Sequence, residues 1–265
     1  DGDGYDDMLV AAPYADTNGT SSGTVFLVPG NRTGSRTLTS SDGRLYGTGS
    51  ADYLGFGMTS VGDQNADGYD DFAVAASRES ISSSEDGAVY TILGPYSSAT
   101  RVSSAADGLY WGGYSGSRAG ETLADGGDHD GDGVSELLVG APYDDWDGTN
   151  SGRVWLIEGP LTNLEAMASH VEISPQQGAG ERLGDAMFAA DFTGDGQADL
   201  AIAAPSYSDS VGYPGVVYLV AGPVTSDMTV GASSTARFEG ADSTSYLGKS
   251  ISGGDVDGDG YQDLV

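Results

Sequence analysis

The 265-residue chain has no cysteine, and it has only 10 lysine and arginine residues against 40 aspartate and glutamate residues. Without cysteine it can form neither disulfides nor thiolate metal sites, and it has no thiol nucleophile. Its formal net charge of −30 leaves little with which to neutralise phosphates, which argues against nucleic acid and anionic membrane surfaces as partners. Because so many carboxylates repel one another unless counter-ions are present, the composition favours cations as partners.

Long apolar runs and helical periodicity are also scarce. No run approaches the roughly 18 residues of a membrane-spanning helix, so we expect no membrane insertion in this chain, and no signal peptide is visible. Only residues 161–168 are expected to form a short helical turn. Glycine is abundant, with 43 residues, which can accompany disorder. Short apolar runs recur at regular spacing, however, so we predict many short strands joined by turns.

An acidic nine-residue segment recurs through the chain. Complete copies begin at residues 63, 128, 191 and 255, at spacings of 65, 63 and 64 residues, and the chain opens inside a further copy at residues 1–7. A fixed period of this length indicates a repeat architecture. The approximate units are 1–62, 63–127, 128–190 and 191–254, with the start of a fifth at 255–265.

A second landmark keeps the same period. Gly23, Gly87, Gly152 and Gly215 each precede an apolar strand that ends at a glycine, usually followed by proline. Within one unit, strands are predicted at 56–61, 72–76, 88–93 and 109–111. Four short strands at a fixed period are typical of a propeller blade. The apolar runs 137–141 and 200–204 predict strands that are buried on both faces. The predicted fold is therefore all-β, a β-propeller of four-stranded antiparallel blades with the acidic loops between strands 1 and 2.

The acidic segment has the ligand spacing of a calcium-binding loop. Ca²⁺ takes six to eight oxygen ligands at roughly 2.3–2.6 Å. Acids at positions 1, 3 and 5 point inward when the chain curls around an ion, and glycine at position 6 permits the sharp turn. The carbonyl of position 7 and the acid of position 9 complete the shell. The first six positions resemble an EF-hand loop, but here the closing acid comes at position 9 and a strand follows.

We therefore predict Ca²⁺ as the cofactor, with one ion in each of the four complete loops. Thr193 is a weaker ligand than an acid, and Glu136 is longer than the aspartate found elsewhere at position 9. The first copy lacks its position 1, which would precede Asp1. The predicted ligands are Asp1, Asp3, Tyr5 and Asp7; Asp63, Asn65, Asp67, Tyr69 and Asp71; Asp128, Asp130, Asp132, Val134 and Glu136; Asp191, Thr193, Asp195, Gln197 and Asp199; and Asp255, Asp257, Asp259, Tyr261 and Asp263.

Other interpretations of the loops are weaker. Mg²⁺ prefers a small octahedral shell with retained waters, and zinc prefers histidine or cysteine. His129 occupies position 2, where the side chain is expected to point outward. A single D-x-D-G segment is often only a polar turn, but five copies in register favour a metal.

Two short signatures accompany the acidic loops. A Leu-Gly-Phe-Gly segment stands at residues 54–57; it is degenerate at 183–185 and 247–249 and nearly lost at 119–121. A Gly-Ala-Pro segment stands at 140–142 and is softened at 11–13, 75–77 and 203–205. Together these motifs resemble the FG-GAP repeats of integrin α-subunit propellers and their prokaryotic relatives, over essentially the whole chain. The resemblance implies a β-propeller with Ca²⁺ on one rim, an extracellular or cell-surface location, and a role in adhesion or protein binding.

The number of units departs from that pattern, because integrin-like propellers usually have seven blades. A closed ring of four blades would hold the loop and strand of residues 1–8 twice, since residues 257–264 repeat their pattern. We expect a stretch of a larger propeller or array, or a ring completed by a partner; closure within four blades stays open.

No catalytic site is predicted. The segment Gly19–Gly23 matches G-x-S-x-G, but a strand follows it where a nucleophile elbow needs a helix. The carboxylate pairs could indicate a glycosidase, yet they recur once per unit. Two functions remain: an adhesive or protein-binding propeller, and a carbohydrate-binding propeller or non-catalytic module of a secreted enzyme. For the second, the aromatic residues that could stack on sugars are Trp111, Tyr114, Tyr143, Trp146 and Tyr213.

Overall fold

The computed structural model describes residues 2–30, 34–35, 37–39, 43–210 and 212–265. The expected all-β class is confirmed. The strands are β1 (Met8–Ala12), β2 (Thr24–Val28), β3 (Gly43–Tyr46), β4 (Leu54–Gly62), β5 (Asp71–Ala76), β6 (Ala88–Ile92), β7 (Ala99–Arg101), β8 (Gly108–Trp111), β9 (Thr122–Gly127), β10 (Glu136–Gly140), β11 (Val154–Ile157), β12 (Leu164–Ala166), β13 (Val171–Ser174), β14 (Ala186–Ala190), β15 (Asp199–Ala204), β16 (Val216–Val220), β17 (Met228–Thr229), β18 (Ala236–Glu239), β19 (Gly253–Gly254) and β20 (Asp263–Leu264).

Helical structure among the described residues is limited to single turns. They are α1 (Val102–Ala105), α2 (Val230–Ser233) and the 3₁₀ turn η1 (Met167–Ser169). The helical turn expected at 161–168 was largely wrong, because residues 164–166 form β12 and the turn follows them. Each turn comes directly after a short strand and buries one apolar side chain, Val102, Met167 or Val230. No helix in the described part of the chain is long and apolar enough to cross a membrane.

Four sheets repeat one arrangement. In the second sheet β4, β5, β6 and β8 follow one another as antiparallel neighbours. The third sheet is β9-β10-β11-β13 and the fourth is β14-β15-β16-β18, while the first contains β1-β2-β3. Among the described residues β19 and β20 pair as a two-stranded antiparallel sheet. In the second, third and fourth sheets the acidic loop follows the first strand, so each of these sheets combines the end of one repeat unit with most of the next.

Three short strands cross from one unit to the sheet before it. β7 pairs in parallel with β3, β12 with β8, and β17 with β13. Each therefore lengthens the outer edge of a sheet whose other strands come from earlier in the chain. These strands lie at the sheet edges opposite to the first strands, of which β9 contacts both β4 and β14.

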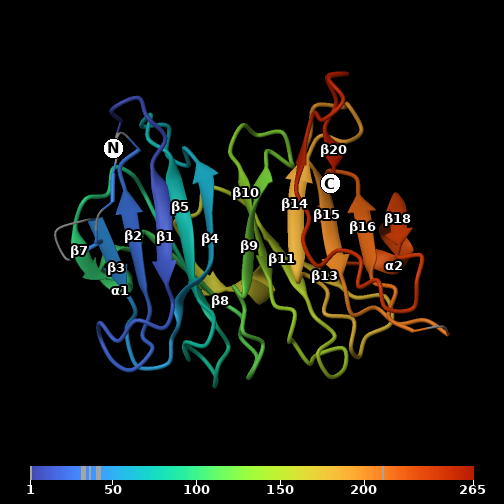
Figure 1. Ribbon diagram of the computed structural model, residues 1–265, viewed down its shortest axis with the longest axis horizontal. Coiled ribbons are helices and arrows are strands. Elements are labelled where there is room, and N and C mark those ends of the chain that lie inside the picture. Colours follow the sequence, from blue (N-terminus) through green and yellow to red (C-terminus); the bar gives the residue numbers. More distant parts are fainter. Residues whose placement is uncertain (1, 31–33, 36, 40–42, 211) are drawn as a thin grey trace.

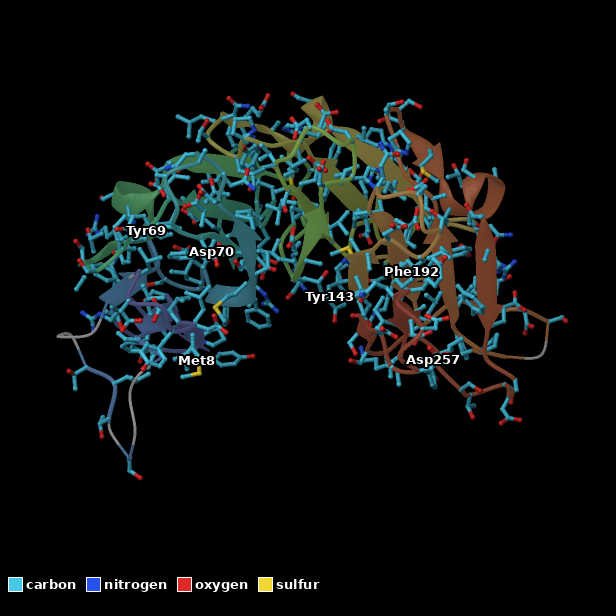
Figure 2. All side chains as sticks on the ribbon, turned by 90° about the horizontal axis from the view of Figure 1, so that it is seen from above. Met8, Tyr69, Asp70, Tyr143, Phe192 and Asp257 are labelled. Atoms are coloured by element: carbon cyan, nitrogen blue, oxygen red, sulfur yellow. The ribbon has the colours of Figure 1, made fainter. Side chains whose placement is uncertain are left out.

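The sheets stand side by side and follow an arc. Figure 1 shows them upright, with the acidic loops at the upper ends of the strands. Viewed from above in Figure 2, the chain runs along the arc, and Met8 and Asp257 lie near its two ends. Neighbouring sheets bury their apolar side chains between them. Leu137 and Val139 pack toward the second sheet, whereas Leu138 packs toward the fourth. This alternation explains why the second strands are apolar throughout.

Candidate metal centres

The four complete acidic loops lie on one rim of the molecule. They connect β4 to β5, β9 to β10, β14 to β15, and β19 to β20. The glycine at position 6 has a positive φ in every copy, from +89° at Gly68 to +94° at Gly133. Residues with a Cβ rarely adopt this conformation, so the turn requires the glycine. The glycine that the loop pattern predicts at the turn is thus the residue at which the backbone needs one.

The acid at position 1 closes over the turn. Asp63 Oδ2 accepts a hydrogen bond of 2.8 Å from the Gly68 N–H, and the same bond runs from Gly133 to Asp128 at 3.1 Å. The third and fourth loops repeat it. The Gly68 N–H lowers the pKa of Asp63, and the equivalent N–H of Gly196 lowers the pKa of Asp191. These bonds favour the ionised carboxylates that a divalent cation needs.

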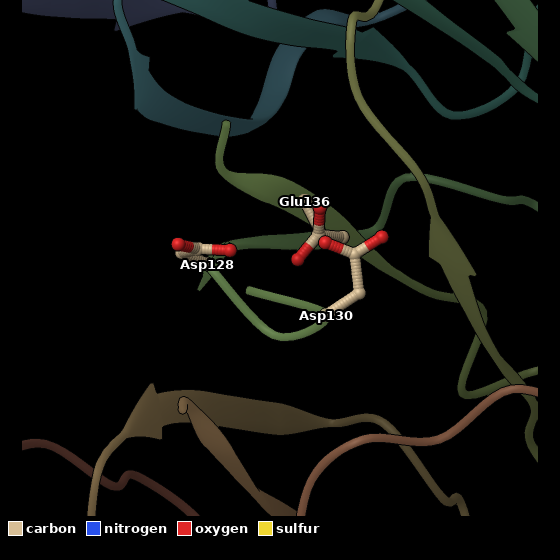
Figure 3. A group of neighbouring side chains, drawn as sticks. All are labelled: Asp128, Asp130 and Glu136. Carbon is tan, nitrogen blue, oxygen red and sulfur yellow. The ribbon is translucent and has the colours of Figure 1, made fainter. Parts of the chain in front are cut away.

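Carboxylate oxygens converge in two of the loops. Asp128, Asp130 and Glu136 each offer an oxygen, and these atoms lie within 4.8 Å of one another (Figure 3). Asp255, Asp257 and Asp259 form a second such group. Two ligands of one Ca²⁺ lie at most about 5 Å apart, given metal–oxygen distances of roughly 2.3–2.6 Å. The spacing and the all-oxygen donor set therefore fit calcium.

The carboxylate at position 5 accepts a hydrogen bond from the backbone N–H of position 7. Asp67 Oδ1 accepts a hydrogen bond of 3.0 Å from the Tyr69 N–H. The equivalent bonds hold Val134, Gln197 and Tyr261. In the first copy Asp3 accepts the same bond from Tyr5 at 3.0 Å, while Asp1 lies outside the described residues. This bond fixes the peptide plane that joins positions 6 and 7, directly before the peptide plane that holds the predicted carbonyl ligand of position 7.

The acid at position 9 joins the loop to its sheet and is buried in three of the four complete loops, whereas Asp263 in the fourth is half-buried. Asp71, Glu136 and Asp199 are all at most 1% exposed. Asp71 accepts hydrogen bonds from the N–H of Gln64 at 2.8 Å and of Gly94 at 2.7 Å. Burial raises the pKa of Asp71, and burial with the neighbouring acids raises that of Glu136 to about 7. A divalent cation in the loop would oppose both shifts.

The glycine at the end of the third strand has a part in this arrangement that sequence patterns did not reveal. Gly30, Gly94 and Gly222 donate their N–H to Asp7, Asp71 and Asp199. A Cβ on Gly94 would lie 2.8 Å from the Asp70 carbonyl oxygen, too close for any side chain. In the sequence these glycines mark only the ends of strands, because their contact with the acid at position 9 depends on the tertiary structure.

The other two complete loops contain non-acidic residues at position 3. Thr193 and Asn65 are exposed, and the Asn65 amide oxygen accepts the Asp67 N–H at 2.9 Å. Neither of these loops forms a group of three acidic oxygens within 4.8 Å among the described residues. The order of loop quality expected from sequence, in which Thr193 marks a weaker site, stays a prediction.

The prediction for position 2 was wrong. His129 was expected to point outward, but it is 1% exposed, and Gln64 at the same position of its loop is 4% exposed. Both side chains turn into the neighbouring sheet. Burial lowers the pKa of His129. Sequence gave little signal here, because the four complete loops carry four different residue types at position 2.

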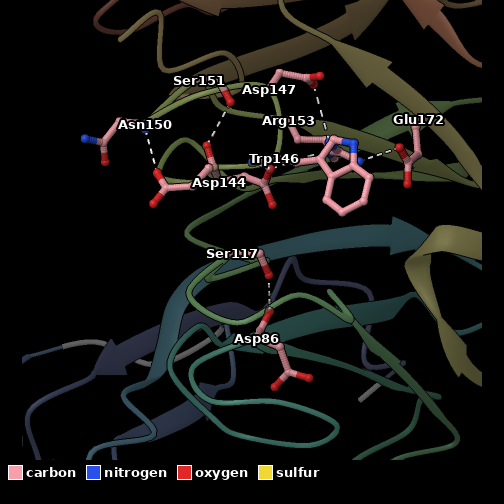
Figure 4. A network of polar contacts seen from close by, with 10 residues as sticks. Asp86, Ser117, Asp144, Trp146, Asp147, Asn150, Ser151, Arg153 and Glu172 are labelled. Carbon is pink, nitrogen blue, oxygen red and sulfur yellow. Dashed lines mark hydrogen bonds and ion pairs between the residues drawn. The ribbon is translucent and has the colours of Figure 1, made fainter. Parts of the chain in front are cut away.

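The opposite rim carries a buried cation. Arg153 is fully buried and forms ion pairs with Asp144 at 3.5 Å, with Asp147 at 3.4 Å, and with Glu172 (Figure 4). Its guanidinium group also lies 5.6 Å from the centres of the Tyr114 and Trp146 rings. A buried cation needs acidic partners, so the carboxylates on this rim stabilise the fold by pairing with Arg153. No sequence motif marked Arg153.

Two of the predicted aromatic residues meet. The Tyr114 and Trp146 rings lie 4.6 Å apart, and Trp146 is 64% exposed. Tyr143 contacts Arg182 instead. Tyr213 stacks on Tyr246, a residue not anticipated. Trp111 lies on β8 and is half-buried.

Comparison with known proteins gives the family. The model of the FG-GAP repeat matches residues 1–28, 59–92, 120–157 and 183–220, which together exceed half of the chain. The chain belongs to the FG-GAP repeat family. It is also 34% identical over 142 residues to phosphatidylinositol-glycan-specific phospholipase D of Bos taurus, and 35% identical over 142 residues to that of Homo sapiens. Each match covers 51% of this chain but only 17% and 16% of the relative.

The two halves of the FG-GAP signature touch across sheets. The FG glycines Gly55, Gly120 and Gly248 have φ between +86° and +98°. A Cβ on Gly120 would lie 2.5 Å from the Cβ of Ala75, the first residue of the GAP-like segment in the preceding sheet. The small residues of the FG-GAP repeat therefore allow neighbouring sheets to approach closely.

Proposed function

We propose that this chain is a calcium-binding stretch of a β-propeller, in which the sheets are four-stranded blades and the acidic loops connect strands 1 and 2. Support comes from the strand order within each sheet, from contacts between β4, β9 and β14, and from the arc in Figure 2. Membership of the FG-GAP repeat family supports the same arrangement. The four units at the approximate boundaries given above would then form part of a larger propeller or array.

The observation that carries the calcium proposal is the convergence of oxygen ligands at Asp128, Asp130 and Glu136. Equivalent loops share the position 1 hydrogen bond and the position 6 glycine. In each complete loop, positions 1, 3, 5 and 9 would bind the ion through side-chain oxygens and position 7 through its carbonyl. Such a shell suits Ca²⁺ better than Mg²⁺, which keeps several waters.

A calcium titration followed by calorimetry, with magnesium in parallel, tests this proposal. We expect up to four sites that prefer calcium. Anomalous scattering from crystals grown with calcium would locate them in the loops beginning at Asp63, Asp128, Asp191 and Asp255. Fewer than two sites, or equal affinity for magnesium, would overturn the proposal.

The wider role that we propose is a non-catalytic interaction module, extracellular or at the cell surface, that binds a protein ligand. The acids recur once per unit, whereas a catalytic pair is needed only once in a protein. Calcium is abundant outside cells, where a calcium-stabilised fold needs no disulfides. The phospholipase D relatives are much longer than the matched region, so their activity is not assigned to this chain. A pull-down from extracellular extracts with and without EDTA tests for a calcium-dependent protein partner; capture of the same partners in both conditions, or of none, would contradict the proposal.

Carbohydrate binding is a second candidate, and the exposed pair Tyr114–Trp146 favours it. Aromatic rings beside carboxylates suit a sugar, because the rings can pack on its C–H face and the carboxylates can accept hydrogen bonds from its hydroxyl groups. A glycan array should show binding that Trp146→Ala abolishes. Phe238→Ala, which removes another exposed ring on β18, is the control and should leave binding unchanged. No glycan binding by the unaltered chain, or loss with both variants, would reject this candidate.

A further inference from the structure

In two of the acidic loops, the side chain at position 2 points away from its own loop and into the neighbouring sheet. Gln64 follows Asp63, and His129 follows Asp128, so each is next to a proposed calcium ligand. Both are buried, at 4% and 1% exposure, on a rim where positions 3 to 6 are exposed. A buried polar side chain needs hydrogen-bond partners. Gln64 Nε2 donates one hydrogen bond of 2.6 Å to the Val61 carbonyl oxygen of its own sheet. The other side-chain partners of Gln64, and both partners of His129, belong to the next sheet.

Gln64 bridges the first complete loop to the second. Its Nε2 donates to the carbonyl oxygen of Ser135 at 2.8 Å, and its Oε1 accepts from the N–H of Leu161 at 3.2 Å. Ser135 is position 8 of the next loop, directly before the closing acid. Leu161 follows the Gly-Pro pair at the end of that sheet's third strand.

His129 makes the equivalent bridge with different chemistry. Its Nδ1 lies 2.5 Å from the carbonyl oxygen of Ala198, and its Nε2 accepts from the N–H of Val224 at 2.6 Å. Ala198 is again position 8 of the next loop, and Val224 again follows a Gly-Pro pair. Because Nε2 is the acceptor, Nδ1 carries the proton and donates. An imidazole thus reproduces the donor and acceptor of a glutamine amide.

The remaining loops provide contrasts within the same chain. Phe192 at position 2 of the third complete loop packs in an apolar cluster, and Val256 in the fourth is 70% exposed. Hydrogen-bonded bridges are therefore found at two interfaces among the described residues.

A return contact closes each connection. Side chains at position 7 contact the preceding loop. Gln197 Nε2, for example, donates a hydrogen bond to the Asp130 carbonyl oxygen at 3.4 Å. The ring of Tyr261 lies so close to Gly194 that a Cβ there would be 2.7 Å away. Neighbouring loops thus touch in both directions along the rim.

We infer that Gln64 and His129 couple adjacent calcium sites, so that occupation of one loop strengthens binding at the next. This rests on the proposed function. Calcium at Asp128 and Asp130 would fix the backbone on both sides of His129, and the bridge would then hold Ala198, which precedes the ligand Asp199. Ordering one loop reduces the entropy lost when the next is ordered, and such coupling is reciprocal.

The test is a double-mutant cycle read at individual sites. The amides of Gly133 and Gly196, which donate to Asp128 and Asp191, report each loop in ¹H–¹⁵N spectra during calcium titration. Asp191→Asn with Asp195→Asn silences the third complete loop. In the unaltered bridge, silencing should weaken calcium binding at Gly133 by about fivefold or more, a typical coupling. With His129→Ala, silencing should have no further effect.

The matched control is His129→Gln, which installs the residue that bridges the preceding interface and should retain the coupling. If His129→Ala does not fold, the same cycle with Gln64→Leu and the amides of Gly68 and Gly133 replaces it. Equal effects of silencing in all backgrounds, or none in the unaltered chain, would overturn the inference while calcium binding stands. Absence of any calcium-dependent shift in the unaltered chain would overturn the proposed function as well.

Discussion

On the rim of the acidic loops, the acids at positions 3 and 5 are exposed, and their described hydrogen bonds come mainly from backbone N–H groups. On the opposite rim, Asp144 is buried and faces the Arg153 guanidinium. Both rims contain several carboxylates in close proximity. The difference lies in what balances their charge: arginine within the chain on one side, and in our proposal a cation from solution on the other.

Removing calcium by chelation should have the largest effect on stability, and this effect should arise at the rim of the acidic loops. Of the 40 acids, 19 lie in the five acidic segments, and without metal their repulsion opposes folding. A ligand bound only by the native state stabilises it by roughly 2.7 kcal/mol per site at a hundred times Kd, equivalent to about 5–10 °C per site in a domain of this size. Thermal melts in EDTA and in excess calcium measure the effect. Identical melting temperatures would show that the loops hold no stabilising ion.

Arg153→Met should destabilise the chain with and without calcium. The change leaves the buried Asp144 and the half-buried Glu172 without their cation, and breaking a buried ion pair in this way typically costs about 3–5 kcal/mol. Urea denaturation in EDTA and in calcium should give the same deficit. If calcium removed the deficit, the two rims would not be independent.

A finer comparison concerns two acids within one loop. Asp67→Ala should weaken calcium binding at its own loop by about tenfold or more, a change of 1.4 kcal/mol, because Asp67 is a proposed ligand. Asp70→Ala removes the same charge at position 8, where the other complete loops carry Ser135, Ala198 and Gln262, and should cost less. Titration followed at the Gly68 amide compares them. Equal losses would mean that the loop acts as a diffuse acidic patch.

The smallest effect is expected at Glu79, a buried acid that accepts hydrogen bonds from Thr48 and from Tyr90. Burial raises the pKa of Glu79 above its ordinary value. The folded chain then keeps a proton that the unfolded chain has released, so stability falls as pH rises from the ordinary value through the raised one. Glu79→Gln should flatten this dependence when stability is measured in EDTA. An unchanged pH profile would show that Glu79 is charged at little cost.

Features of the fold that depend on neighbouring residues in sequence could be predicted. The turning glycine, the strand pattern around β5 and the spacing of loop acids all follow from local conformational preferences and a fixed period. The roles of Gln64 and His129 could not, because a position 2 side chain meets atoms about 70 residues further along. Arg153 was missed because its partners belong to no motif: Asp144 and Asp147 lie in the loop before it, and Glu172 lies on a different strand of the sheet.

The short parallel strands β7, β12 and β17 have a consequence for how the chain is made. Each completes the outer edge of a sheet that precedes its own unit. During synthesis, which releases roughly 5–20 residues per second, the second sheet can receive β12 only after some fifty further residues beyond β8 have emerged. A sheet therefore waits several seconds for its last strand, and a fragment cut at the repeat boundary would leave that edge open to pairing with other chains.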